Sequence, residues 1–133
     1  LKVRTSFLAI FSLVFLAFSL NHFIISYSSP YLVAVMALII GGIGIGLFAP
    51  NSSSWLGSVA PAESRGKAVG GMTSMLYLGQ FFSPIIAQPL INQVGLSATF
   101  ALAGGADLLI ALLFGFAAAR QGQVITPAIE TKR

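Results

Sequence analysis

The chain has 133 residues, of which 56% are hydrophobic and 8% are charged, and it has no cysteine. Soluble domains carry roughly 25% charged residues, so this composition excludes a soluble protein, and the missing thiols exclude disulfides. The net charge of +4 does not indicate nucleic-acid binding, because the cations lie in gaps between apolar runs. The composition therefore predicts an all-α membrane protein surrounded by lipid.

Four apolar segments follow one another along the chain, each near the roughly 20 residues that a membrane-spanning helix needs. Turn signals separate them at Ser28-Ser29-Pro30, at residues 60–67 and at Gly95, and Ser97 is a candidate N-cap for the last helix. We predict four transmembrane helices over residues 7–27, 31–57, 68–94 and 97–119. An N-terminal segment (1–6) precedes them, and a polar tail (120–133) follows.

The lysine and arginine residues all fall on one side of this topology. Lys2 and Arg4 precede the first helix, and Arg65 and Lys67 lie between the second and third. The other three follow the fourth helix: Arg120, Lys132 and Arg133. The positive-inside rule makes this side cytoplasmic. We therefore expect a multi-pass protein of the cell (inner) membrane with both termini in the cytoplasm. A cleaved signal peptide is the alternative interpretation of the first apolar run, which is long for that purpose.

Small residues and prolines recur in the second and third helices. In lipid, small side chains let helices approach closely, and proline removes a backbone hydrogen bond and bends a helix. The charged turn Glu63-Ser64-Arg65-Gly66-Lys67 precedes the third helix, and we predict that it is a cytoplasmic hinge. The positions predicted to serve helix packing or bending are Gly42, Gly46, Gly70, Gly79 and Pro84.

Asp107 lies near the centre of the fourth predicted helix, where a carboxylate costs roughly 2.5–3.5 kcal/mol to insert. It shares a helical face with Gly104 and Ala111, so it should face protein or a cavity rather than lipid. One interpretation is an ion-coupling carboxylate that binds a proton or a cation. The other is an aspartate that only fixes helix packing. His22, towards the outer end of the first helix, is expected at the membrane interface.

A polar stripe runs along the third predicted helix, with Pro84 within it. Spacings of four, three and eight residues place its members on one face: Thr73, Tyr77, Gln80 and Gln88. Such a stripe can line a substrate cavity, and we take these residues as candidates for that role. Interhelical hydrogen bonding is the alternative.

The sequence contains no enzymatic constellation. It has one histidine, and its three acidic residues are too far apart in the predicted topology to act as a pair. No metal-binding motif occurs. The GGIGIG run is not a nucleotide-binding fingerprint, because it lies inside an apolar span rather than after a strand. We expect a protein that is not an enzyme and that uses no cofactor and no metal.

Three features together resemble the major facilitator superfamily of secondary transporters. They are the glycine-rich helix from Gly41 to Pro50, the turn from Pro61 to Gly70, and the section from Gly79 to Pro84. The chain looks like helices nine to twelve of that twelve-helix fold. The resemblance implies alternating access, a cavity lined by the second and third helices here, and supporting roles for the first and fourth. It also implies that the partners are the missing N-terminal helices of the same transporter, or another copy.

We therefore expect part of a secondary active transporter of small molecules, with proton-coupled efflux as one form of that activity. Two alternatives remain open. The first is a free-standing four-helix protein that acts as a dimeric small exporter. Such exporters use a carboxylate in their first helix, and the first predicted helix here has none. The second is a non-transport membrane scaffold. The residues do not identify the substrate, the direction of transport or the coupling ion.

Overall fold

A computed structural model describes residues 2–27 and 30–123, which form four long α-helices and one short 3₁₀ helix, without a strand in these ranges. The predicted tail beyond residue 123 and the turn residues Ser28 and Ser29 lie outside the described residues. The α-helices are α1 (Lys2–Tyr27), α2 (Tyr31–Val59), α3 (Arg65–Val94) and α4 (Leu96–Gln123), and the 3₁₀ helix is Ala62–Ser64. The protein is therefore an all-α membrane protein, as predicted.

Each helix is long enough to cross a bilayer. Helices of 26 to 30 residues span about 40–45 Å at a rise of 1.5 Å per residue, more than the hydrocarbon core of about 30 Å. By length and hydropathy, three of them qualify as membrane spans: Phe7–Tyr27, Tyr31–Val59 and Leu96–Arg120. Helix α3 is less apolar than these three because its glycines, prolines and glutamines interrupt the apolar residues.

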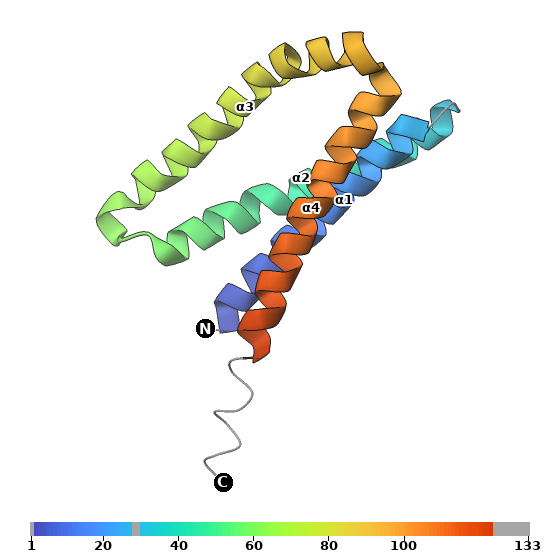
Figure 1. Cartoon of the computed structure of the whole chain (residues 1–133). Helices are drawn as coiled ribbons and strands as arrows, with labels where there is room; N and C mark the ends of the chain where they lie inside the picture. Colours follow the sequence, from blue (N-terminus) through green and yellow to red (C-terminus); the bar gives the residue numbers. More distant parts are fainter. Residues whose placement is uncertain (1, 28–29, 124–133) are drawn as a thin grey trace.

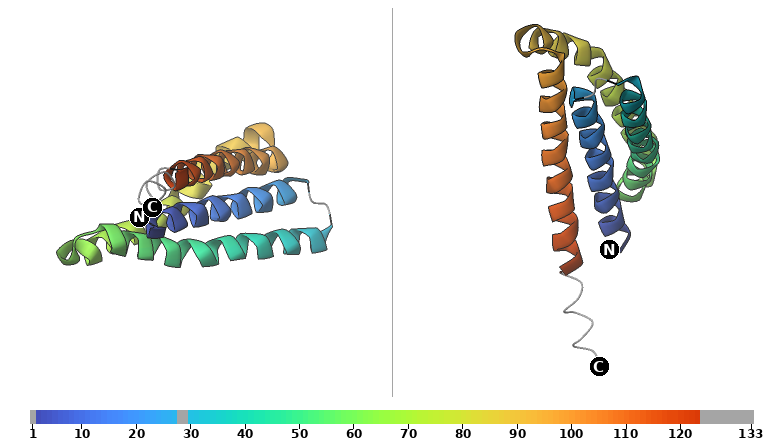
Figure 2. Two further views of the ribbon diagram at one scale, coloured as in Figure 1. Left: turned by 90° about the horizontal axis from the view of Figure 1, so that it is seen from below. Right: turned by 90° about the vertical axis from the view of Figure 1, so that its right-hand side faces the viewer.

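The helices run alternately in opposite directions, with α1 between α2 and α4 (Figure 2). The amide of Asn51 donates to the carbonyl of Phe7 at 3.2 Å, which places the end of α2 beside the start of α1. The hydroxyl of Ser26 donates to the carbonyl of Ser97 at 2.7 Å, which places the end of α1 beside the start of α4. The end of α2 and the start of α4 therefore lie at opposite ends of α1, so α3, which joins them, runs along the full length of the bundle (Figure 1).

The contact between α1 and α4 is built on a repeat of seven residues, which we call the α1–α4 seam. Three serines of α1 each donate a hydroxyl hydrogen bond to a carbonyl of α4, at 2.7–2.8 Å. The pairs are Ser12 with Ala111, Ser19 with Gly104, and Ser26 with Ser97. A seven-residue spacing keeps one face of each helix towards the other, and small residues let the backbones approach. These bonds fix the register of the two helices.

Close packing between α1 and α2 uses glycines that are near neighbours of those predicted. A Cβ at Gly44 would lie 2.7 Å from the ring of Phe18, and a Cβ at Gly41 would lie 3.0 Å from the amide of Asn21. The predicted positions Gly42 and Gly46 point away from α1, and nothing lies within 4 Å of a Cβ there. All four glycines lie on the same turns of α2. The rotation of α2 about its axis decides that Gly41 and Gly44, rather than Gly42 and Gly46, contact α1.

The turn before α3 is shorter than predicted. Arg65, Gly66 and Lys67 are the first residues of α3 rather than part of a loop, and only Glu63 and Ser64 of the predicted hinge lie in the 3₁₀ helix. The guanidinium of Arg65 donates through Nε to the carbonyl of Ala60 at 3.3 Å, which holds the start of α3 against the end of α2.

At the other end of α3, Gly95 has a φ of +84° and closes the turn into α4. Helix α4 begins directly at Leu96, so Ser97 is not its N-cap.

Candidate functional site

Helix α3 has no buried residue, and along its middle it lies apart from the other helices (Figure 1). The predicted polar stripe lies on this helix, and all four of its members are exposed. Thr73 donates its hydroxyl hydrogen bond to the carbonyl of Val69 in its own helix, and Gln88 donates to Asn92 at 3.4 Å. Tyr77 is 66% exposed. No residue of the other described helices covers the stripe, so the interhelical bonding that was the alternative does not occur within them.

The helix packing predicted at Gly70 and Gly79 is also not found within the described helices. Nothing lies within 4 Å of a Cβ placed at Gly70 or Gly79. Pro84 and Pro89 lie inside the helix, which Figure 1 shows to be bent. Bending at prolines fits this shape, because each ring removes one backbone hydrogen bond.

Asp107 is paired with His22 across the α1–α4 seam. The Nδ1 atom of His22 and the Oδ2 atom of Asp107 lie 2.8 Å apart, within hydrogen-bond distance. The imidazole stacks on the ring of Phe100, with centroids 5.9 Å apart. The side chains are 28% and 18% exposed, so the pair is largely enclosed by the two helices.

Sequence reasoning identified each member of this pair separately but missed the pairing. The two residues are 85 positions apart, and His22 was expected at the membrane interface. One signal could have joined them: they are the only residues of the types Asp, Glu, His, Lys and Arg inside the predicted spans. Because an unpaired polar group costs free energy in lipid, two such groups on neighbouring helices tend to pair.

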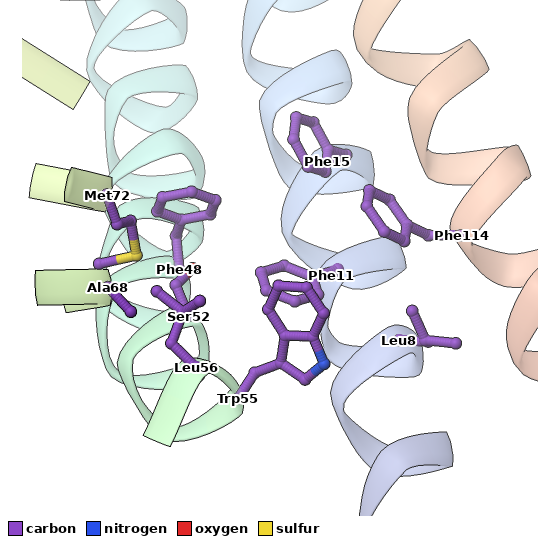
Figure 3. A pocket seen from close by; sticks show the side chains of 10 residues that line it. All are labelled: Leu8, Phe11, Phe15, Phe48, Ser52, Trp55, Leu56, Ala68, Met72 and Phe114. Carbon is purple, nitrogen blue, oxygen red and sulfur yellow. The ribbon is translucent and has the colours of Figure 1, made fainter. Parts of the chain in front are cut away.

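A cavity of about 430 Å³ lies between α1, α2, α4 and the start of α3 (Figure 3). Half of its lining residues are aromatic, and Phe11 makes edge contacts with Trp55 and Phe48, each with centroids 6.1 Å apart. The buried hydroxyl of Ser52, in the wall, has no hydrogen-bond partner among the described residues. None of the stripe residues lines it. The lining residues are Leu8, Phe11, Phe15, Phe48, Ser52, Trp55, Leu56, Ala68, Met72 and Phe114.

The described residues contain no cluster of three or more His, Cys, Asp or Glu side chains that could hold a metal ion. His22 and Asp107 supply two ligands, fewer than the four that a structural zinc site uses.

A protein-family model described as Major Facilitator Superfamily matches residues 2–132 of the chain. The match includes all four helices and nearly every residue. No curated protein and no solved structure matches the chain.

Proposed function

The chain belongs to the Major Facilitator Superfamily, whose members are membrane transporters rather than enzymes, and we propose that it forms part of a secondary active transporter of small molecules. The finer proposal is proton-coupled efflux, with Asp107 as the ion-coupling residue. One observation carries the transport proposal beyond family membership: a polar stripe is exposed along a bent helix that has no buried residue.

The stripe is suited to line a substrate passage. A hydroxyl, a phenol and two amides can donate and accept hydrogen bonds without adding charge to the membrane interior. Glycine and proline in the same helix let it bend as the passage opens and closes, and interrupted helices are where transporters place their sites. Small polar molecules that form hydrogen bonds are the substrate class that suits such a lining.

We propose that further helices of the same transporter cover the other faces of α3. Large apolar side chains are exposed on several sides of this helix, among them Met75, Phe81 and Ile86, and the aromatic cavity at its start is partly open. A helix that carries both a polar stripe and apolar flanks fits between a passage and neighbouring helices. Pairing with a second copy of this chain is the competing outcome.

The orientation proposed is that of a multi-pass protein of the cell (inner) membrane with both termini in the cytoplasm. Arg65 and Lys67 begin α3, on the side where α1 begins and α2 ends. Arg120 lies in the last turn of α4, on the same side, where its guanidinium stacks on Phe116 at 4.3 Å. Cations gathered on one side support this orientation through the positive-inside rule.

Transport by the full-length transporter in proteoliposomes tests the proposal. The probes are radiolabelled sugars and amino acids, with ethidium as an amphipathic cation, each followed with and without an imposed pH gradient. We expect accumulation of at least one probe, and a fall of about two- to tenfold in its rate for Gln80→Leu, because one lost hydrogen bond is worth about 0.5–1.5 kcal/mol. Gln93→Leu is the matched control, since residue 93 lies about 220° around the helix from residue 80.

Two outcomes would overturn parts of this proposal. Failure of the wild type to move any probe would favour a non-transport scaffold. Equal loss in Gln80→Leu and Gln93→Leu would remove the stripe from the passage. A monomer that contains this chain together with further helices would support the proposal that those helices cover α3. A dimer of a four-helix chain would favour the small exporter.

A further inference from the structure

We propose that His22 and Asp107 together bind one exchangeable proton, at a site that is separate from the substrate passage and acts on it through the α1–α4 seam. This inference deepens the proton-coupling part of the proposed function and rests on it. It adds a second residue to the proton site. It also predicts that proton and substrate do not compete for the same groups.

The geometry requires a proton between the two side chains. Nδ1 and Oδ2 both accept hydrogen bonds when unprotonated, so a contact of 2.8 Å needs a hydrogen on one of them. A neutral imidazole with its hydrogen on Nδ1 satisfies a carboxylate, and the pair then carries a net charge of −1. Uptake of one more proton, by either ring or carboxyl, keeps the bond and makes the pair neutral. The site therefore exchanges one proton without losing its hydrogen bond.

No other ionisable side chain of the surrounding helices lies nearby to fix the charge of the pair. On α4 the other one is Arg120, thirteen residues away, or about 20 Å along the helix. Helix α2 contributes only its first residue, Tyr31. Near the pair, Gly41 of α2 lies against Asn21 of α1. Helix α3 carries Arg65 and Lys67 in its first turn, at the end of the helix that is farther from the pair, and Tyr77 in the stripe. On α1, Tyr27 is five residues away, and Lys2 and Arg4 are at the other end.

The pair lies beside a close approach of α1 and α4 at Gly104. A Cβ at Gly104 would lie 3.3 Å from the Cβ of His22 and 3.2 Å from the ring of Phe23. The serine bonds to Gly104 and Ser97 belong to the same stretch of the seam. A net charge that appears or disappears here changes the cost of enclosing the seam in lipid. Since the stripe on α3 does not contact the pair, the proton acts through helix packing rather than on the substrate.

Infrared spectroscopy of the full-length transporter tests proton binding without depending on transport. We expect a protonated-carboxyl band that titrates with pH and is absent in Asp107→Asn. In His22→Gln the band should persist, with its midpoint moved by about one pH unit or more, a tenfold change in proton affinity. Ser12→Ala is the matched control, because it removes a seam hydrogen bond without a titratable group. Asp107→Glu, which restores a carboxyl, should recover a titrating band.

Transport measurements test the coupling. Asp107→Asn should lose accumulation driven by a pH gradient while it retains substrate exchange at equal pH on both sides. Saturating substrate should leave proton uptake by the wild type intact rather than displace the proton.

The outcomes separate this inference from the proposed function. A band that does not titrate, or a midpoint that His22→Gln and Ser12→Ala leave equally unchanged, would overturn the paired site, although wild-type transport would still stand. Titration of the pair without transport of any probe would reject the transporter and keep the proton site. Displacement of the proton by substrate would refute the separation of the two sites.

Discussion

Gly44 is the residue on which the contact between α1 and α2 depends most directly. A Cβ there would lie 2.7 Å from the Cε1 atom of Phe18 and 3.4 Å from the backbone carbonyl of Val14. The ring can turn aside, but the carbonyl cannot move without α1. At Gly46, two residues further along, a Cβ meets nothing within 4 Å. Two glycines of the same sequence run therefore have different structural roles.

We predict that Gly44→Leu destabilises the protein by about 1–3 kcal/mol, the usual cost of overpacking a close contact. Gly46→Leu should change the free energy of unfolding little, because its side chain points away from α1. Thermal unfolding in detergent, followed by the fluorescence of Trp55, measures both. Equal destabilisation of the two variants would contradict the packing of α2 on α1.

The pair of His22 and Asp107 shows what the sequence can and cannot predict about a single residue. The cost of inserting Asp107 was evident from the sequence, and so was its direction towards protein, because the helix geometry of one segment determines both. The identity of its partner was not evident. A contact across 85 positions depends on which helices are neighbours and on their relative height in the membrane.

Among the elements, α3 and α4 are joined by the tightest connection, a single residue. Gly95 adopts a φ of +84° and a ψ of 166°, a backbone region that is essentially restricted to glycine. Its amide donates to the carbonyl of Ile91, and its carbonyl accepts from the amide and the hydroxyl of Thr99. This one residue ends one helix and begins the next, which explains why Ser97 has no capping role.

We expect Gly95→Ala to lower the free energy of unfolding by about 1–3 kcal/mol, because a Cβ disfavours this backbone conformation. Gly105→Ala is the control, since residue 105 is helical and a Cβ there meets nothing within 4 Å. That substitution should be neutral or stabilising, by up to about 1 kcal/mol. Chemical denaturation in mixed micelles distinguishes the two. A neutral Gly95→Ala would mean that the turn can adopt another conformation.

At the scale of the whole molecule, α3 is the helix whose place is settled by its neighbours rather than by its own hydropathy. The side-chain bonds of Asn51 and Ser26 place the end of α2 and the start of α4 on opposite sides of the bundle. A chain that joins those two points runs along the full length of the bundle. The arrangement of cations predicts that this run is a fourth membrane crossing.

Cysteine labelling in intact cells tests this topology directly, with any cysteine outside this chain replaced, since the 133 residues themselves contain none. We predict that an impermeant maleimide labels Tyr31→Cys and Leu96→Cys from outside. Ser58→Cys and Glu63→Cys should react only after the membrane is permeabilised. External labelling of Glu63→Cys would mean that α3 does not cross, and the passage proposed along it would then be lost.

The sequence by itself determined the solvent, the number of helices and the clustering of cations, because each depends on local composition matched to the thickness and charge preference of a bilayer. The resemblance to major facilitators also rested on local motifs, and the family match confirms it. The candidate site was predicted only in part. The stripe on α3 follows from the period of one helix, and its role in a passage remains a prediction.

Only the tertiary structure decided which helix faces meet. It selected Gly41 and Gly44 over Gly42 and Gly46, aligned the serines of α1 with the carbonyls of α4, and paired His22 with Asp107. A rotation of α2 by about 100°, the angle between successive residues, exchanges its packed face for another without changing any local preference. Contacts between helices therefore depend on rotation and relative height, which are properties of the assembled bundle and not of any one segment.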